Sequence, residues 1–363
     1  MTITAIQKAK RDAYRCFPRR DAVEAVMDHL GAQGRVDWQL APLMAERLRH
    51  VYPKIAETVY PEYLAAEGGV LPIDSSASPA DETWRKYTMD QQGVCAWIDD
   101  DGDFAPSNSI TLRQDDGRFA NFGHMWDVTI FDLERAAKAQ LQLQTLKGKM
   151  SKRAHQVWKN WHWLFGDSPH EMEGLCTHPN IHVLLAAFDS ATGNTSRLWA
   201  NKTDADIFRD IKRVIDLVPT YTIRAHFIAK VFLPLNLVQE CMGRFLAGTD
   251  SGVVTLWDRI VKAFSGDPVT GQGKVEFRIL NECQGTLRRH PVSGTDTSGI
   301  TGDFILACPP DDVEMNAFMS ARPFSQEAPQ QVKLKIQTLT HEKIGGARIQ
   351  TPKAFVRMDF GLT

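Results

Sequence analysis

Five side chains with the chemistry of zinc ligands lie between positions 162 and 182: His162, His170, Cys176, His178 and His182. Cys-x-His and His-x3-His spacings occur in zinc sites, where four such ligands surround the ion. A predicted helix holds His162, however, and a proline-interrupted segment without a matching second ligand pair holds the others. The pattern therefore favours structural or surface histidines, and a soluble metal-dependent enzyme that uses the 162–182 cluster stays as an alternative.

Two further stretches imitate ligand-binding loops without completing them. The acidic run 99–103 begins like a calcium loop, but Phe104 replaces the required glycine and Ile110 replaces the required bidentate acid. The stretch 266–274 resembles a phosphate-binding loop, but Gln272 stands where a lysine is required. The sequence therefore predicts no catalytic residue, no metal ligand and no cofactor, and we expect a protein that is not an enzyme.

The composition is that of a globular protein with reduced cysteines. The 363 residues are 43% hydrophobic and 24% charged, which suffices for two or three modules with a sizeable core. The six cysteines form no CxxC pair, as is typical of intracellular proteins. No apolar run approaches the ~20 residues of a membrane helix, and the N-terminus shows no secretion signal. We expect a soluble protein made in the cytoplasm, with no membrane partner.

The charge is nearly balanced along most of the chain. A net charge of −2 argues against a dedicated nucleic-acid binder, which needs a basic surface. The exception is the first 20 residues, where six basic side chains face only Asp12: Lys8, Lys10, Arg11, Arg15, Arg19 and Arg20. This stretch is either a solvated N-terminal helix or a segment that touches an anionic partner.

The residue pattern of 1–66 predicts a helical segment. The pattern of 82–129 predicts a long hairpin with two arms. Arms of ~12 to 15 residues would span ~40 to 50 Å, whereas a compact chain of this length has a radius of gyration of only ~21 Å. An isolated hairpin is marginal in water, so this one needs a partner surface. Its aromatic side chains are the candidate inter-subunit contacts: Trp84, Tyr87, Trp97, Phe104 and Trp126.

Residues 147–165 predict a long amphipathic helix after a shorter helical segment at 132–142. Its apolar residues recur at helical spacing in one stripe: Met150, Ala154, Val157, Trp158, Trp161, Leu164 and Phe165. We expect this stripe to be buried, with Val157, Trp158, Trp161, Leu164 and Phe165 as its core.

From residue 179 onward, strand and helix patterns alternate, which predicts an α+β fold. Thr203 is expected to cap a helix, with Asp206 completing a capping box. A second helix is expected around 253–264, strands at 226–233, 275–279 and 304–307, and a loop over 286–302. Further strands are expected at 332–336 and 349–356.

The order of these segments resembles the major capsid proteins of bacteriophages of the Hong Kong 97 type, in the branch shared with encapsulin-like shell proteins. Five segments carry the resemblance, which spans roughly residues 70–360: 70–73 (VLPI), 87–93 (YTMDQQG), 132–137 with 149–167, 174–180, and 344–354 (IGGARIQTPKA). Each segment alone is weak, and their shared order and spacing make the match.

The resemblance implies a Hong Kong 97-like fold in five parts. These are an N-terminal arm (1–66), an extended loop (67–129), a peripheral domain with a spine helix (130–178), an axial domain (179–325), and return strands of the peripheral domain (326–363). The Lys–Asn–acid trio with which some relatives cross-link their subunits has no counterpart that we can place here.

The resemblance also implies a structural function. Pentamers and hexamers of the chain would form an icosahedral shell around the double-stranded DNA of a tailed phage, assembled in the host cytoplasm as the virion capsid. Portal, scaffolding and decoration proteins are possible partners, and DNA would be enclosed without sequence specificity. An encapsulin-type nanocompartment shell is the alternative within the same fold.

Overall fold

The computed structural model describes residues 61–92, 109–138, 142–190, 193, 196–245, 254–265 and 274–361. The chain divides into two compact units, Met1–Pro61 and Glu62–Thr363, and all described helices and strands belong to the second. The expected N-terminal helix, the acidic run 99–103 and most of the glycine-rich stretch 266–274 lie outside the described residues, as do Trp97 and Phe104.

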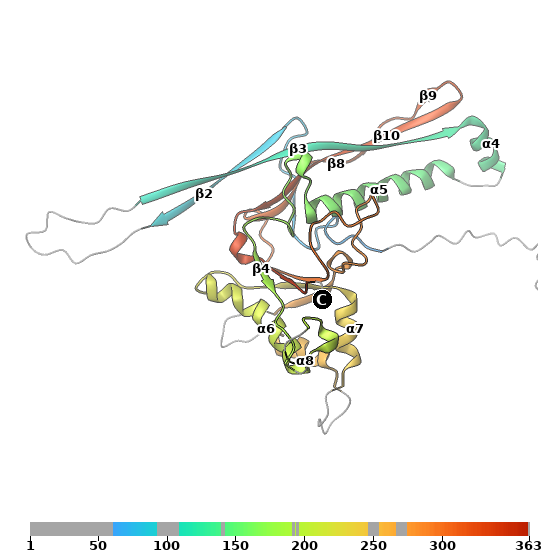
Figure 1. Cartoon of the computed structure of the whole chain (residues 1–363). Coiled ribbons are helices and arrows are strands. Elements are labelled where there is room, and N and C mark those ends of the chain that lie inside the picture. The colour runs from blue at the N-terminus through green and yellow to red at the C-terminus, as the bar shows by residue number, and fades with distance from the viewer. Residues whose placement is uncertain are drawn as a thin grey trace, which may run out of the picture. The chain divides into compact units, whose positions relative to one another are not determined.

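A six-stranded sheet, here called the long sheet, runs across the upper part of Figure 1. Its strand order is β1 (Ile73–Asp74), β8 (Asn316–Gln326), β10 (Lys335–Ile349), β3 (Ser109–Thr129) and β2 (Thr83–Gln92), with β9 (Gln330–Val332) also paired to β10. The β1–β8 pair is parallel and the other pairs are antiparallel. The first 10 residues of β3 pair with β2 and the rest pair with β10. The expected pairing of two arms is therefore confirmed, and the second arm is the first half of one long strand.

A five-stranded sheet, the compact sheet, lies below it in Figure 1. Its order is β4 (His182–Leu185), β11 (Val356–Asp359), β7 (Phe304–Cys308), β5 (Lys230–Leu233) and β6 (Glu276–Ile279). Three helices accompany it: α6 (Asp204–Tyr221), α7 (Leu235–Gly243) and α8 (Leu256–Ala263). Every residue of β5 and β7 is buried, and apart from Lys230 both strands consist of apolar residues without an alternating pattern. The expected return segment 326–363 thus contributes to both sheets, since β10 lies in the long sheet and β11 in the compact one.

Helices α4 (Ile130–Lys138) and α5 (Leu143–Phe165) follow β3, close to the predicted positions. The C-terminal part of the predicted stripe is buried: Trp161, Leu164 and Phe165 are at most 7% exposed, and Val157 and Trp158 are half-buried. The N-terminal part was predicted wrongly, because Met150 is 70% exposed and Ala154 is exposed too. In that part of α5, the polar residues Ser151 and His155 are buried instead.

One predicted helix start is confirmed with a difference. The Thr203 hydroxyl accepts a hydrogen bond from the Asp206 backbone N–H at 3.2 Å, as a cap should. The Asp206 carboxylate accepts bonds from the Thr203 hydroxyl and from Ser190, so it does not complete the capping box. A complete capping box occurs instead at α8, between Thr255 and Asp258. Two sheets with separate helical segments confirm the predicted α+β class.

Candidate assembly surfaces

The hairpin of β2 and residues 109–118 of β3 has two unlike faces. Residues directly opposite each other in an antiparallel pair share a face, and the register places Met89 opposite Leu112 and Tyr87 opposite Gln114. On this face lie four large apolar side chains that are each at least 55% exposed: Tyr87, Met89, Ile110 and Leu112. We call these four residues the apolar hairpin face. Two strands alone cannot bury it, so within the described residues it faces solvent.

Two of the predicted aromatic contacts turn towards their own subunit. Trp84 lies on the opposite face, so close above Gly117 that a Cβ there would be 2.4 Å from the indole ring. Trp126 is 6% exposed within the subunit. Of the described aromatic candidates, Tyr87 is therefore the one that is largely exposed, at 57%. Met89, Ile110 and Leu112 were not among the predicted contacts. Their signal in the sequence is the alternate spacing of Tyr87 with Met89 on one arm and of Ile110 with Leu112 on the other.

A cleft of about 210 Å³, here called the root cleft, lies where the hairpin leaves the rest of the long sheet. Residues 113–118 of β3 line one side, and the segment 171–173 lines another. Arg118 forms an ion pair with Glu171 at 3.0 Å across it, and both side chains are more than 60% exposed. His178 contacts Glu173 at 3.1 Å and lowers the pKa of that carboxyl.

A buried ion pair fixes the segment that leads into the hairpin. Arg348 on β10 donates to Asp74 on β1 at 2.8 Å, and both residues are nearly buried. Burial alone would raise the pKa of Asp74, but hydrogen bonds from Ser76 and Arg348 outweigh it and lower the pKa. The pair therefore connects β1, which precedes the hairpin, to β10, the strand that pairs with the second half of β3.

Helix α5 packs on the long sheet through a stripe of polar side chains spaced four residues apart. Lys147 donates to the Asp127 carbonyl, and the Ser151 hydroxyl lies 2.6 Å from that of Thr340. His155 Nε2 lies 3.1 Å from the same Thr340 hydroxyl. One turn further on, Lys159 lies 3.7 Å from the Glu342 carboxylate.

The stripe ends in an apolar anchor at Trp163, which is fully buried and stacked on Phe318 with 4.9 Å between ring centroids. The Trp163 indole N–H donates to the Gly345 carbonyl at 3.1 Å. The helix is therefore held by dense apolar packing at its C-terminal end and by hydrogen bonds along the rest.

The predicted histidine and cysteine cluster does not converge on one point. His162 lies against Trp158 at 4.3 Å between ring centroids, and burial lowers its pKa. His182 lies against Tyr221, on the compact sheet. Burial raises the pKa of the Cys176 thiol to about 12, which keeps it protonated and a poor nucleophile or ligand. Among the described residues, no group of three or more His, Cys, Asp or Glu side chains is placed to hold a metal ion.

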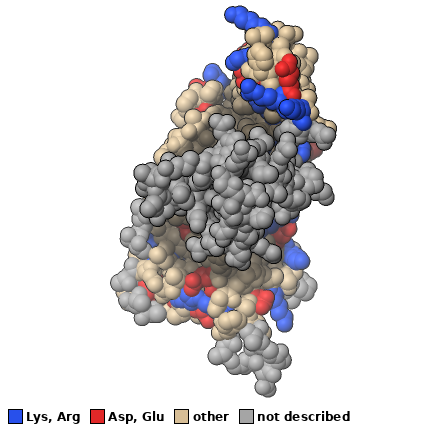
Figure 2. All heavy atoms as spheres, turned by 90° about the vertical axis from the view of Figure 1, so that its right-hand side faces the viewer, with Lys and Arg blue, Asp and Glu red and all other residues tan. Residues whose placement is uncertain are grey.

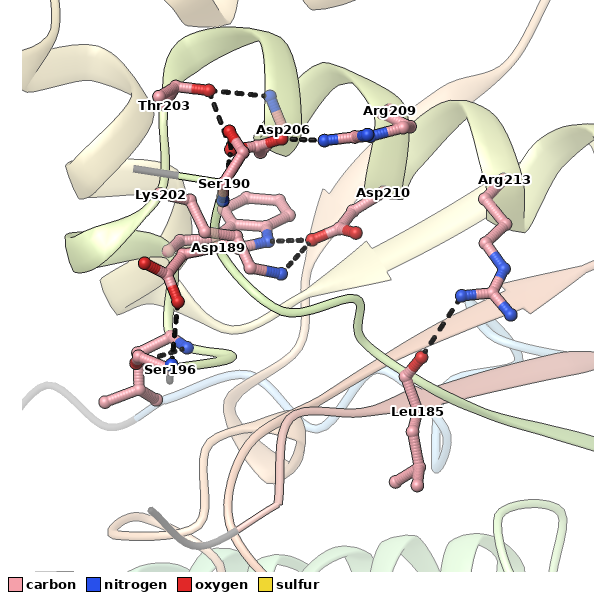
Figure 3. A network of polar contacts seen from close by, with 12 residues as sticks. Leu185, Asp189, Ser190, Ser196, Lys202, Thr203, Asp206, Arg209, Asp210 and Arg213 are labelled. Carbon is pink, nitrogen blue, oxygen red and sulfur yellow. Dashed lines mark hydrogen bonds and ion pairs between the residues drawn. The ribbon is translucent and has the colours of Figure 1, made fainter. Parts of the chain in front are cut away.

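A network of polar contacts lies beside α6 (Figure 3). Lys202 and the Trp199 indole N–H both donate to Asp210, and all three side chains are buried. Arg244 reaches the carbonyls of Lys202 and Trp199 at 2.6 and 2.7 Å. These hydrogen bonds join residues of different elements, so the network fixes the segment before α6 to α7.

Within the part of the chain that the structure describes, no helix combines the length and apolar character needed to cross a membrane.

Comparison with known proteins gives a family match and several matches in fold. Residues 93–250 match the model of the major capsid protein family. No curated protein sequence matches the chain. Among solved structures, the capsid of Myoviridae phage XM1 is similar with a TM-score of 0.68 and 12% identity, over 88% of this chain and 98% of that one.

Two further solved structures are similar over nearly their whole length. A Mycobacterium phage Ogopogo chain has a TM-score of 0.57 and 11% identity, over 87% of this chain and 97% of its own. The capsid of an empty GTA particle has a TM-score of 0.51 and 9% identity, over 90% and 100% of the two chains. Identities this low show a shared fold.

Proposed function

We propose that this chain, which resembles bacteriophage major capsid proteins of the Hong Kong 97 type in both sequence and fold, is the structural shell protein of a tailed phage. The family match and the capsid structures confirm the resemblance predicted from the order of sequence segments. They favour neither the nanocompartment nor the enzyme alternative.

The observation that carries the proposal is the apolar hairpin face. Four large apolar side chains on this hairpin are mostly exposed to solvent in an isolated subunit. Contiguous exposed apolar surface marks an interaction site. A neighbouring copy supplies a surface that covers them. The hairpin of each copy would then lie on the next one, a heterologous contact that repeats into closed rings.

The five-part division expected from the sequence stays a proposal, and in it β8 belongs with the long sheet and β11 with the compact sheet. In our proposal the compact sheet and α6 to α8 form the axial domain around which pentamers and hexamers assemble. The long sheet and α5 form the peripheral domain. The capsid structures with the same fold support assembly of copies into a shell.

Double-stranded DNA is the proposed content, held without sequence specificity. On the described part of the face in Figure 2, Lys and Arg side chains stand beside Asp and Glu instead of forming one basic field. Together with the net charge of −2, this mixed charge is compatible with a shell wall that encloses DNA without binding it tightly. Assembly in the host cytoplasm and contacts with portal, scaffolding or decoration proteins belong to the same proposal.

The test is a subunit whose hairpin is removed without damage to its body. The Phe119 N–H donates to the Glu82 carbonyl at 2.9 Å, so the two ends of the segment 83–118 are adjacent. Replacing that segment with a short Gly-Ser turn leaves the whole β3–β10 pairing intact. A deletion that extended to residue 127 would remove Trp126 and most of a core strand, so it could not separate folding from assembly.

We expect the shortened chain to remain folded, with a melting temperature close to that of the full chain, and to form no shells in negative-stain electron microscopy. Normal shells from the shortened chain would contradict the proposed role of the hairpin. Shells of the full chain that contain a co-expressed enzyme and no DNA during phage growth would favour the nanocompartment alternative.

A further inference from the structure

The two partners of β3 lie on opposite edges of that strand. The Phe119 N–H points towards β2, since it donates to the Glu82 carbonyl, and the Ile130 N–H points towards β10, since it donates to the Leu334 carbonyl at 3.0 Å. Backbone groups of successive residues in an antiparallel strand point to alternate sides. Neither register shifts within β3, so odd-numbered residues face the β2 edge and even-numbered residues face the β10 edge.

It follows that the hairpin half of β3 has an open edge. The β10 pairing ends at Phe119, whereas the even-numbered residues of 110–118 still direct their N–H and C=O groups to that side. No described strand pairs with them there. We call this the inner edge. A straight, unpaired strand edge is a template for pairing with another chain.

The inner edge opens into the root cleft. Residues 113–118 form one wall of the cleft, and Gly346 and Ala347 on the diverging end of β10 form another. The Arg118–Glu171 ion pair that crosses it is exposed on both sides. Exposed ion pairs contribute little to stability, so an arriving strand can displace this one.

We infer that the inner edge receives an extended strand of a second copy of this chain, an inference that rests on the proposed function. The outer edge of β2 likewise has no described partner, so within residues 61–92 and the other described ranges each copy carries two unlike open edges. Unlike edges pair head to tail and can repeat around a ring, which a shell requires. Ile110 and Leu112, 65% and 64% exposed, lie along the inner edge and supply apolar contacts for the side chains of the added strand.

A pair of substitutions at Gln114 separates the backbone from the side chain. Its N–H points away from β2, so Gln114→Pro removes no hydrogen bond within the hairpin, and proline is tolerated at strand edges. Gln114→Ala is the matched control, because both variants lose the side-chain bond to Asp116. We expect both variants to keep the wild-type melting temperature, Gln114→Ala to form shells, and Gln114→Pro to lose shell formation. Equal assembly of the two variants would overturn the inference.

Residue-resolved hydrogen exchange on the purified chain identifies the occupant. In free subunits, even-numbered amides between 110 and 118 should exchange quickly and odd-numbered ones slowly; in shells both sets should be protected. Protection already present in free subunits would mean that the same chain covers the edge. Protection that appears only with another phage protein would assign the edge to that protein. Either result overturns the inference.

Two outcomes distinguish this inference from the proposed function. Shells whose even-numbered amides stay unprotected overturn the inference and leave the shell function standing. A wild-type chain that forms no shells under any condition contradicts the proposed function, and the inference fails with it.

Discussion

Polar substitution on the apolar hairpin face should block assembly and leave the subunit folded. The change is Ile110→Asn together with Leu112→Asn, two residues that are 65% and 64% exposed in the subunit. Because they already face solvent, replacing them removes little core packing. Thr111→Asn is the control, since Thr111 lies between them, is also exposed, and points to the opposite face.

The size of the effect depends on the surface that remains to be buried. Full burial of an exposed Ile or Leu contributes about 1.5 to 3 kcal/mol. With roughly two thirds of each side chain still exposed, docking on a neighbour would contribute about 1 to 2 kcal/mol per residue. The double variant should therefore weaken each hairpin contact by about 2 to 4 kcal/mol, or roughly 30- to 700-fold.

The assay is light scattering and electron microscopy across a series of subunit concentrations. We expect the double variant to need a far higher concentration than wild type, or to form no shells, while Thr111→Asn assembles normally. Circular dichroism melts of all three proteins should coincide. Assembly of the double variant at the wild-type threshold would refute the reasoning, as would an equal defect in Thr111→Asn.

Three further predictions concern the subunit itself. Trp163→Ala should lower the free energy of unfolding by about 3 to 5 kcal/mol in urea titrations, whereas Met150→Ala should change it little. Equal effects of the two substitutions would contradict the burial of Trp163 and the exposure of Met150. Burial raises the pKa of Glu282 in the folded state, so wild type gains stability as pH falls through that raised value towards the unfolded one. Glu282→Gln should therefore be the more stable protein at neutral pH, with a gap in melting temperature that closes in acid; a pH-independent gap would contradict this. Lys202→Met should cost about 3 to 5 kcal/mol by leaving the Asp210 carboxylate buried without its cation, and adding Asp210→Leu should recover much of the loss in the same titration. A further loss would mean that Asp210 matters mainly through its hydrogen bond from Trp199.

The hairpin could be predicted because its signals are local. Turn residues, alternating side chains and a lack of apolar residues to bury are properties of the segment itself. The sequence could not show which aromatic residues point outward, because that depends on contacts with distant strands. Trp84 turns inward over Gly117, and Trp126 is buried on the half of β3 that pairs with β10.

The long helix shows the limit of periodicity. The apolar residues of α5 have helical spacing along its whole length, yet Met150 and Ala154 are exposed while Ser151 and His155 are buried. Thr340 and Glu342, nearly 200 positions away, provide the polar surface that makes this favourable. A hydrophobic pattern carries no information about such partners. Strand β8 was missed for a related reason: its first six residues are all buried, so it lacks the alternation that marks a half-exposed strand.

Stability and assembly are carried by different parts of the subunit, and this makes the assembly predictions interpretable. The main apolar core unites the compact sheet with the C-terminal end of α5. Within the described hairpin, Trp84 is the one residue that packs against either apolar cluster. Substitutions on the apolar hairpin face or the inner edge therefore act far from the contacts that fold the chain. A loss of shells at an unchanged melting temperature then reports on contacts between copies, because Ile110 and Leu112 are largely exposed in the subunit.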